Sequence, residues 1–156
     1  MLPEETKGAL RLRAEDADDL AVISACLQDA LVPVGDIVYM PQEQSFLFVA
    51  NRFRWEDGPQ MEGEPGHVRT LCAVAFDAVE AVLYRGFRRE ERERILVLLA
   101  MRPEPLRAEG GGAVRLDFSG GATIRLETGR IRCRVRDVGL PWPTSWRPAH
   151  DQGDPR

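Results

Sequence analysis

The sequence predicts an α+β fold, with one N-terminal amphipathic helix packed on a curved, mostly antiparallel sheet of about seven strands. Apolar residues recur at helical spacing once, within residues 16–31, whereas later segments alternate apolar with polar residues, which is the period of a β-strand. The length of 156 residues suits one domain. We expect this domain over residues 10–140, between a flexible N-terminus (1–9) and an extended Pro/Trp-rich tail (141–156) packed on it.

The predicted helix begins after a capping residue. Asp16 can accept a hydrogen bond from the first turn, and two further aspartates in that turn suit the positive end of the helix dipole. The helix is expected to end near Leu31, because Pro33 disfavours a helical conformation in the residue before it. A short strand is expected ahead of the helix, at Leu10–Arg13. The apolar face of the helix consists of Leu20, Ile23, Leu27 and Leu31.

A β-hairpin is expected from Gly35–Met40 and Ser45–Arg54, near the middle of the core. The polar loop between them has four residues, 41–44. That loop length sets apolar residues opposite apolar residues on both faces. Further along, Arg52 and Arg54 alternate with aromatic residues, so we expect the second strand to leave the core with one wet face. The expected pairs are Tyr39 with Phe46, Val38 with Leu47 and Ile37 with Phe48.

Residues 69–101 are predicted to form further strands. Apolar side chains alternate within residues 72–76, and two more apolar runs, 79–87 and 95–101, are separated by a charged turn. Alanine and leucine are also frequent between Ala73 and Tyr84. A buried helix is therefore the alternative there, because periodicity does not separate strand from helix in short runs.

The clearest hairpin is Val114–Glu127, in which apolar and polar residues alternate on both sides of a glycine pair. A two-residue loop, Gly120-Gly121, would set apolar side chains opposite polar ones. A three-residue loop, Ser119–Gly121, restores apolar pairing and puts Gly121 where such a loop requires a positive φ. The pairs it predicts are Phe118 with Ala122, Leu116 with Ile124 and Val114 with Leu126.

The segment Arg130–Val138 alternates strictly between arginine and apolar residues. As a strand it places Ile131, Cys133 and Val135 on one face, whereas a helix would group Ile131 with Val135 and Val138. Strict alternation favours the strand. The opposite face would then carry an arginine row that can meet phosphate or carboxylate groups, consisting of Arg130, Arg132, Arg134 and Arg136.

Composition excludes several classes of protein. The net charge of −4 disfavours a general nucleic-acid binder, whose affinity comes mainly from phosphate contacts. Cys26, Cys72 and Cys133 are odd in number and lie among apolar residues, which is typical of core thiols in a reducing compartment. The start lacks a basic and apolar leader, and the longest apolar run, Ile95–Met101, is too short to cross a bilayer. We therefore expect a cytoplasmic protein without membrane contact.

No catalytic constellation is apparent in the sequence. The histidines, His67 and His150, lack further ligands at metal spacing, and no phosphate-binding or dinucleotide-binding motif is present, so neither metal nor cofactor is expected. The carboxylates cluster in residues 16–19 and 90–93, where a helix start and a charged turn explain them better than paired acid and base groups do. The expectation leans against an enzyme.

Two features are candidate interaction surfaces. One is the arginine row with the neighbouring hairpin arginines, and the other is the aromatic tail. The simpler interpretations are a solvated sheet face, with arginines paired to Asp117, Glu127 and Asp137, and a tail packed on the protein's own core. The candidate residues are Arg115, Arg125, Arg130, Arg132, Arg134, Arg136, Trp142, Trp146 and Arg147.

These observations favour a non-catalytic cytoplasmic binding or scaffolding module with an unidentified protein partner, and they leave a homodimer open. A first alternative is a small enzyme or ligand-binding barrel with a pocket near His67, Arg69 and Tyr84. A second alternative is RNA contact through the arginine row, whose affinity would depend strongly on salt.

Four stretches resemble one family: AFDAVEAVLYRGF, LLAMRPE, GGATIRLE and RVRDVGLPWPTSWRPAHD. They are similar to short alphaproteobacterial proteins that carry the label domain of unknown function 2948, over about residues 10–151. The resemblance implies no catalytic or ligand residues. The Gly129-Arg130 start of the last arginine-rich segment is unusual within it.

The order of elements also suggests how the sheet curves. A long sheet with two buried faces near Tyr39 and Phe46 is expected to roll toward a barrel. A pleckstrin-homology-like barrel is one specific form, by analogy of element order. That form requires Arg130–Val138 to be helical.

Overall fold

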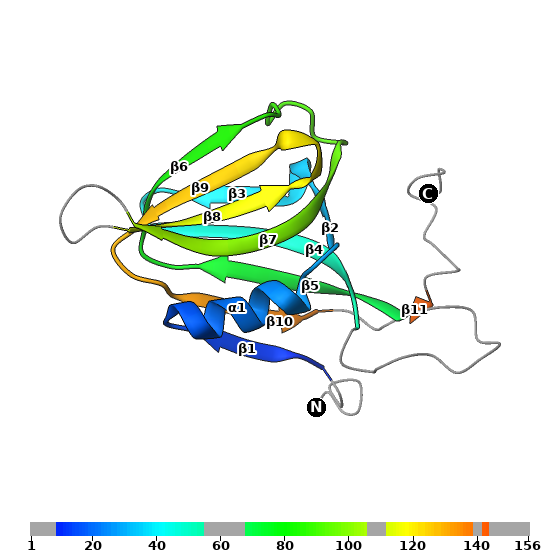
Figure 1. The fold of residues 1–156 in the computed structure, drawn as a ribbon. Coiled ribbons are helices and arrows are strands. Elements are labelled where there is room, and N and C mark those ends of the chain that lie inside the picture. Colours follow the sequence, from blue (N-terminus) through cyan, green and yellow to red (C-terminus); the bar gives the residue numbers. More distant parts are fainter. Residues whose placement is uncertain (1–8, 55–67, 106–111, 139–141, 144–156) are drawn as a thin grey trace.

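One antiparallel sheet and one helix make up the fold in a computed structural model, which describes residues 9–54, 68–105, 112–138 and 142–143 (Figure 1). Eleven strands form the sheet in the order β1-β10-β5-β4-β2-β7-β8-β9-β6, with β3 beside β4 and β11 beside β5. The elements are β1 (Arg11–Ala14), α1 (Ala17–Cys26), β2 (Leu31–Pro33), β3 (Ile37–Met40), β4 (Ser45–Phe53), β5 (Val68–Phe76), β6 (Val79–Arg85), β7 (Ile95–Pro105), β8 (Gly112–Phe118), β9 (Thr123–Thr128), β10 (Cys133–Asp137) and β11 (Trp142–Pro143).

The α+β class and the antiparallel sheet are confirmed, whereas the number of strands differs from about seven. Part of the difference comes from short strands such as β2 and the two-residue β11, which are too brief to leave a period in the sequence. The sheet is open, with β1 and β6 at its two ends. Because Cys133–Asp137 is a strand, the condition for a pleckstrin-homology-like barrel is not met.

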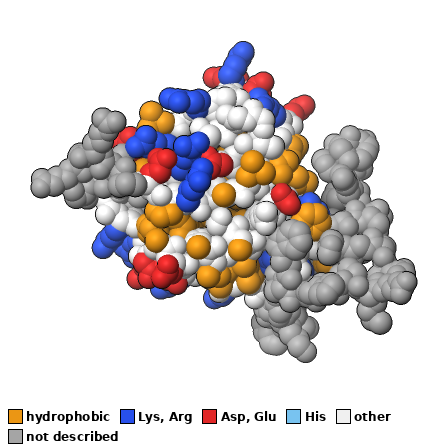
Figure 2. Space-filling model, in the orientation of Figure 1, with side chains coloured by type: hydrophobic (Ala, Val, Ile, Leu, Met, Phe, Trp, Pro, Cys, Tyr) orange, Lys and Arg blue, Asp and Glu red, His pale blue; other side chains and the backbone are white. Residues whose placement is uncertain are grey.

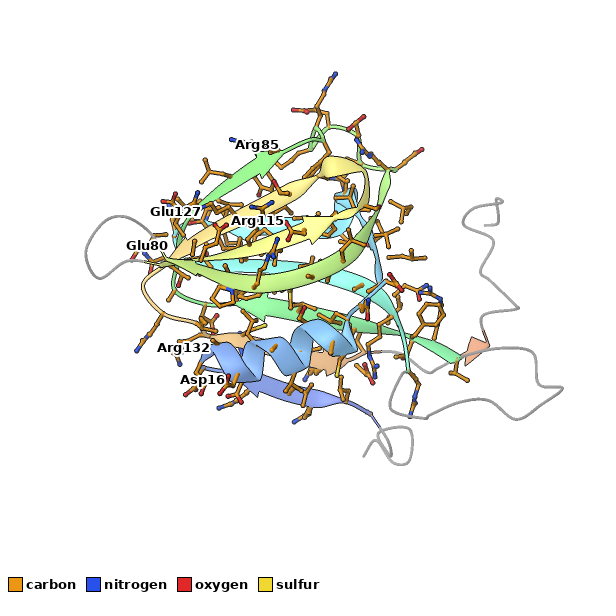
Figure 3. The ribbon with its side chains drawn as sticks, viewed as in Figure 1. Asp16, Glu80, Arg85, Arg115, Glu127 and Arg132 are labelled. Carbon is orange, nitrogen blue, oxygen red and sulfur yellow. The ribbon has the colours of Figure 1, made fainter. Side chains whose placement is uncertain are left out.

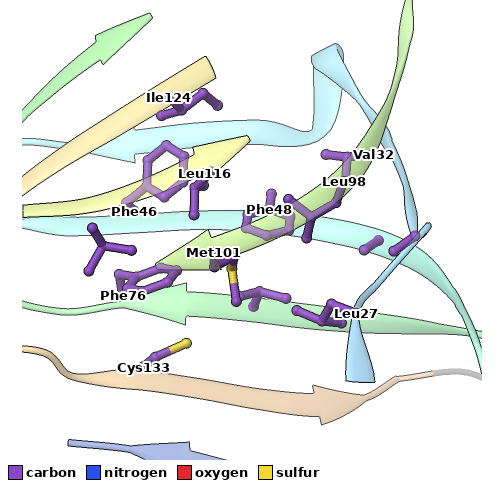
Figure 4. Close-up of a cluster of buried hydrophobic side chains, with 14 of the residues drawn as sticks. Leu27, Val32, Phe46, Phe48, Phe76, Leu98, Met101, Leu116, Ile124 and Cys133 are labelled. Carbon is purple, nitrogen blue, oxygen red and sulfur yellow. The ribbon is translucent and has the colours of Figure 1, made fainter. Parts of the chain in front are cut away.

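The sheet bends into two layers at β2. Leu31 pairs with Asn51 of β4 on one side and with Val97 of β7 on the other, so this strand joins the layers. The first layer contains β1, β10, β5, β4 and β3, and the second contains β7, β8, β9 and β6 (Figure 1). Buried side chains from both layers form one apolar cluster between them, which includes Phe46, Phe76 and Leu116 (Figure 4).

Helix α1 lies against β7 and β1 and packs its apolar face into the core. Asp16 caps it as predicted, because its Oδ1 accepts a hydrogen bond from the backbone N–H of Asp19 at 2.8 Å. The predicted end near Leu31 is wrong, since the helix stops at Cys26. The backbone N–H of Asp29 donates to the carbonyl of Leu98 in β7, so strand pairing replaces the last helical turn.

The predicted residue pairs of both hairpins are confirmed, although the first strand begins at Ile37 rather than Gly35. In the first, Tyr39 lies opposite Phe46. In the second, Leu116 lies opposite Ile124, and the turn spans Ser119–Gly121. Gly121 has the predicted positive φ of 82°, and Gly120 also has a positive φ of 76°.

Residues 69–101 form strands as predicted, and the helical alternative for Ala73–Tyr84 is wrong. The chain passes from β5 in the first layer to β6 in the second through Asp77 and Ala78. Ala78 has a φ of 62°, a conformation that a turn can adopt but a continuous helix cannot.

The expected wet face at Arg52 is also wrong. Arg52 continues the inward series of Phe46, Phe48 and Ala50 along β4 and is fully buried. It forms an ion pair with Asp137 of β10, whose side chain is 4% exposed. Asp137 therefore lies on the inner face of the sheet rather than among the surface arginines.

Candidate functional site

Four arginines lie together on the outer face of the first layer. Arg134 and Arg136 point outward from β10, and Arg11 and Arg13 point outward from β1. The two strands are antiparallel, so Arg11 lies opposite Arg136 and Arg13 lies opposite Arg134. Directly opposite residues have Cβ atoms about 5 Å apart. We call these four exposed residues the arginine array.

Strand alternation explains why the array faces solvent. In β10, Cys133 and Val135 are buried in the core, so the residues between and after them project to the other side. In β1, Ala14 is buried and Leu12 packs against the same core. The sequence RLRA of β1 and the sequence CRVRD of β10 therefore each bury their apolar residues and expose their arginines.

The array is repulsive within itself. Like charges directly opposite each other destabilise a sheet. Within the described part of the chain, one carboxylate pairs with the array: Asp77 Oδ1 lies 3.3 Å from Arg134 Nη2. Arg11, Arg13 and Arg136 have no ion-pair partner among the described residues. Most of the positive charge of the array is therefore not neutralised by carboxylates of the described residues.

A shallow hollow of about 710 Å³ borders the array. Its floor is formed by Ala73 and Ala75 of β5, and Leu47 of β4 lines its opposite side. Because β5 lies between β10 and β4, the two borders are about 10 Å apart, twice the spacing of neighbouring strands. The small alanine side chains create the depression between longer neighbours.

The apolar character of the floor continues across the first layer. Eight large apolar side chains of the described residues are exposed, and four lie on this face: Val38 at 46%, Met40 at 38%, Leu71 at 36% and Val138 at 48%. Val38, Met40 and Leu71 occupy outward positions of β3 and β5, and Val138 follows Asp137, which faces inward at the end of β10. The face combines an apolar field with a basic border, a pairing that is typical of protein-binding surfaces.

The hairpin arginines Arg115 and Arg125 lie on the second layer, apart from the array. Arg115 Nε donates to Asp117 Oδ1 at 2.6 Å, and its Nη1 lies 3.4 Å from Glu104 Oε2. Glu104 Oε1 also lies 3.7 Å from Arg125 Nε. The hydrogen bond to Asp117 and that carboxylate's charge raise the pKa of Arg115 above its ordinary value.

Basic and acidic side chains lie next to one another over this second layer (Figure 2). Arg102 adds a further pair, with its Nη2 2.8 Å from Asp117 Oδ2. A hollow of about 380 Å³ between these side chains is lined by both charges, including Arg85 and Glu127. The second layer therefore matches the simpler interpretation of a solvated, ion-paired sheet face.

The predicted arginine row is interrupted before β10. Arg130 and Arg132 precede the strand, and Figure 3 shows Arg132 beside the first layer and Arg115 on the second. The Thr128 hydroxyl turns the chain locally, because it donates to the carbonyl of Arg130 at 2.6 Å and accepts from the N–H of Arg130 at 3.2 Å. The alternation of a strand therefore does not extend back to Arg130. Of the four predicted arginines, only Arg134 and Arg136 lie on the outer face of β10.

The remaining predicted site residues are not assembled into one site. Trp142 belongs to β11 and pairs with Arg69 of β5, whereas Trp146 and Arg147 lie outside the described residues. His67 also lies outside them. Arg69 donates to Asn51 Oδ1 at 2.7 Å and stacks over Phe53, with 3.7 Å between its Cζ and the ring centre.

Tyr84, the third residue of the predicted pocket, belongs to β6 in the second layer. Its ring packs edge-on against Phe87, and Arg89 lies over its face at 4.6 Å. Burial raises the pKa of Tyr84 above its ordinary value. The hollow that Tyr84 lines does not include Arg69, so the described residues place the two in separate surroundings.

The buried thiols of Cys72 and Cys133 are expected to be unreactive. Burial raises the pKa of Cys72 and of Cys133 to about 12, so both carry their proton at neutral pH. Within the described ranges, no cluster of three or more His, Cys, Asp or Glu side chains could hold a metal ion. Nor is any helix there long and apolar enough to cross a membrane.

Sequence reasoning missed Arg11 and Arg13. Their alternation in RLRA was visible, but the partner of this short strand was not, because β1 pairs with β10 across most of the chain. The parity of Phe46, Phe48, Ala50 and Arg52 would similarly have placed Arg52 on the inner face.

Comparison with known proteins adds a family to this geometry. No curated protein and no solved structure matches the chain. A family model described as "Protein of unknown function (DUF2948)" matches residues 10–150, which include the array, the hollow and both hairpins. The match confirms the predicted family, whereas the alphaproteobacterial origin stays a prediction. The chain belongs to the family of proteins of unknown function DUF2948.

Proposed function

We propose that the protein is a non-catalytic cytoplasmic binding module whose contact surface is the arginine array together with the hollow beside it. The observation that carries the proposal is the pairing of Arg11 with Arg136 and of Arg13 with Arg134 directly across two strands. Such like-charge pairs lower stability. Repulsion between these arginines lowers the stability of the protein alone, and carboxylates of a partner would neutralise it. A surface with this property suits a binding site.

The expected partner is a protein. The array adjoins an apolar field that includes Val38, Met40 and Leu71, and protein interfaces combine an apolar centre with arginine contacts. Nucleic-acid binding depends instead on a wide basic footprint. The net charge of −4 and the separation of Arg115 and Arg125 from the array favour a protein partner over RNA.

Charge reversal on one face tests this function. Tagged wild-type protein and the variant Arg134→Glu/Arg136→Glu are used to capture proteins from an extract of the source cells, and the captured proteins are compared by quantitative mass spectrometry. A matched control, Arg85→Glu/Arg88→Glu, changes the net charge equally at exposed residues away from the array. We expect the first variant to lose specific proteins that the control retains.

Identical capture by all three proteins would contradict the proposed surface. Nuclease treatment separates the RNA alternative, because an RNA-dependent interaction disappears after digestion whereas a protein contact persists. A urea midpoint of Arg134→Glu/Arg136→Glu that is no lower than the midpoint of the control variant would exclude loss of folding as the cause.

A further inference from the structure

We infer that the hollow over Ala73 and Ala75 binds an extended acidic segment of a partner protein, in which carboxylate and apolar residues alternate. This inference rests on the proposed function and specifies the chemistry and conformation of the occupant. Its basis is the different character of the two borders: β10 presents arginines, whereas β4 presents Leu47. A segment lying lengthwise over β5 faces charge on one side and apolar surface on the other.

The spacing of the arginines sets the spacing of the carboxylates. Arg134 and Arg136 are two residues apart on one strand face, which separates them by about 7 Å along β10. In an extended segment, side chains on the same side also repeat every second residue, at the same distance. Carboxylates at alternate positions can therefore each meet one arginine of β10, without a change in register along the segment.

The width of the hollow favours a single extended chain. Its borders, β10 and β4, are about 10 Å apart, and an α-helix with its side chains is about 10–12 Å wide. An extended backbone can lie on the alanine floor and direct its side chains sideways to both borders. A helix would rest on the rims and leave Ala75, which is 8% exposed, without contact.

The apolar border sets the residues between the carboxylates. Leu47 lies opposite Ala75, and Val49 lies opposite Ala73 in the next row toward β4. Both are partly exposed and point outward with the alanines. An apolar side chain at each intervening position of the segment would cover this border, whereas a second carboxylate there would lose its hydration without gaining a cation.

The second pair of arginines strengthens the charge of the same border. On β1, the strand beyond β10 as seen from the hollow, Arg13 lies opposite Arg134 and Arg11 lies opposite Arg136. Each carboxylate of the segment would therefore face a pair of guanidinium groups. Asp77 Oδ1 lies 3.3 Å from Arg134 Nη2, so one arginine of this border already forms an ion pair with a carboxylate of the protein itself. Binding of further carboxylates relieves the repulsion across each row.

Two short peptides of equal composition test the inference with the full-length protein. One is capped Glu-Val-Glu-Val-Glu, which alternates, and the other is capped Glu-Glu-Glu-Val-Val. We expect the alternating peptide to bind about fivefold more tightly. The second peptide can still set its first and third carboxylates against Arg134 and Arg136, but it turns its second carboxylate toward Leu47, where that group loses hydration without gaining a cation. Fluorescence anisotropy at low and moderate salt measures both affinities.

Variants locate the binding. Arg134→Gln/Arg136→Gln should weaken the alternating peptide about tenfold and remove its preference over the other peptide. Arg85→Gln/Arg88→Gln, at exposed positions away from the hollow, should change neither affinity. Cross-saturation NMR should place the peptide's valine methyl groups next to Leu47.

Several outcomes would overturn the inference. Equal affinity of the two peptides would exclude the alternating register, and this result leaves arginine-dependent capture of a native partner untouched. Tighter binding of a uridine oligonucleotide of matched charge would identify the occupant as nucleic acid. Self-association in sedimentation experiments that Arg134→Gln/Arg136→Gln abolishes would identify it as a second copy of this chain.

Discussion

Arg52 and Asp137 form a bidentate ion pair inside the protein. Arg52 Nε donates to Asp137 Oδ1 at 3.0 Å, and Arg52 Nη2 donates to Oδ2 at 2.9 Å. The backbone N–H of Leu10 donates to the same Oδ2 at 2.8 Å, and Arg52 Nη1 donates to the carbonyl of Phe53 at 2.9 Å. The pair therefore connects β4, β10 and the residue that precedes β1 on the inner face of the first layer.

Removal of one charge from this pair should strongly destabilise the protein. We expect Asp137→Asn to lower the free energy of unfolding by about 3–5 kcal/mol, because the fully buried guanidinium of Arg52 would lose the charge of the carboxylate that it contacts through two hydrogen bonds. Urea unfolding followed by circular dichroism measures the change. As a comparison, Asp77→Asn removes an exposed pair and should cost less than about 1 kcal/mol. Equal losses in the two variants would contradict the buried pair.

Replacement of one array arginine should stabilise the protein. Arg136 lies opposite Arg11, so Arg136→Thr removes a like-charge pair and introduces a residue with high strand propensity. We expect the free energy of unfolding to rise by about 0.2–1 kcal/mol, less so at high salt. Arg115→Thr is the contrasting control, since Arg115 is paired with Asp117 and Glu104. A decrease in stability for Arg136→Thr would show that the array is not repulsive.

Two glycines with similar positive φ should respond differently to alanine. Gly120 has a φ of 76° with open space around its missing side chain, so Gly120→Ala should cost only the backbone term of about 1–2 kcal/mol. Gly86 has a φ of 86°, and a Cβ there would lie 2.5 Å from the carbonyl oxygen of Gly121. Gly86→Ala should therefore cost clearly more. Thermal unfolding of both variants makes the comparison, and a reversed order would contradict the close approach.

The buried thiols should make stability fall in alkaline solution. Folding raises the pKa of Cys72 and Cys133 from 9.0 to about 12, so between these values the folded protein holds protons that the unfolded chain has lost. Their contribution is present in full below pH 9 and is lost as pH rises toward 12, at no more than about 1.4 kcal/mol per pH unit for each thiol.

Urea unfolding at pH 8, 9.5 and 10.5 measures this decline. The variant Cys72→Ala/Cys133→Ala should lose less stability over the same range, although it starts lower because two side chains are smaller. Parallel declines in the two proteins would exclude the thiols as the cause. A thiol reagent at pH 8 gives an independent check, since Cys72 and Cys133 should react only after unfolding.

Local sequence patterns predicted the elements whose partners are close in the chain. The turn Ser119–Gly121 and the pairing of Tyr39 with Phe46 followed from parity, because a shift of one residue would have exposed every apolar side chain. The cap at Asp16 likewise depends on neighbouring residues alone. By contrast, the end of α1 was misplaced because the backbone of Asp29 and Ala30 hydrogen-bonds to Leu98 in a distant strand, β7, instead of continuing the helix.

The candidate site was only half predictable for the same reason. Arg134 and Arg136 were identified from alternation within one segment, whereas Arg11 and Arg13 join them through a long-range pairing that no local period encodes. Asp137 was expected near the arginine row, but strand parity turns it inward to Arg52. Arg11 and Arg13, which complete the array, lie near the start of the described chain, whereas Asp137, which completes the ion pair with Arg52, lies near its end.

The pairing of β1 with β10 also fixes an order of events in folding. Leu10 and Asp137, whose hydrogen bond joins these strands, are 127 positions apart. The β3–β4 and β8–β9 hairpins can close as soon as they emerge from the ribosome, whereas β1 has no sheet partner until β10 has been synthesised. The four guanidinium groups therefore come together only late, and a nascent chain cannot engage a partner through this surface before its β-sheet is nearly complete.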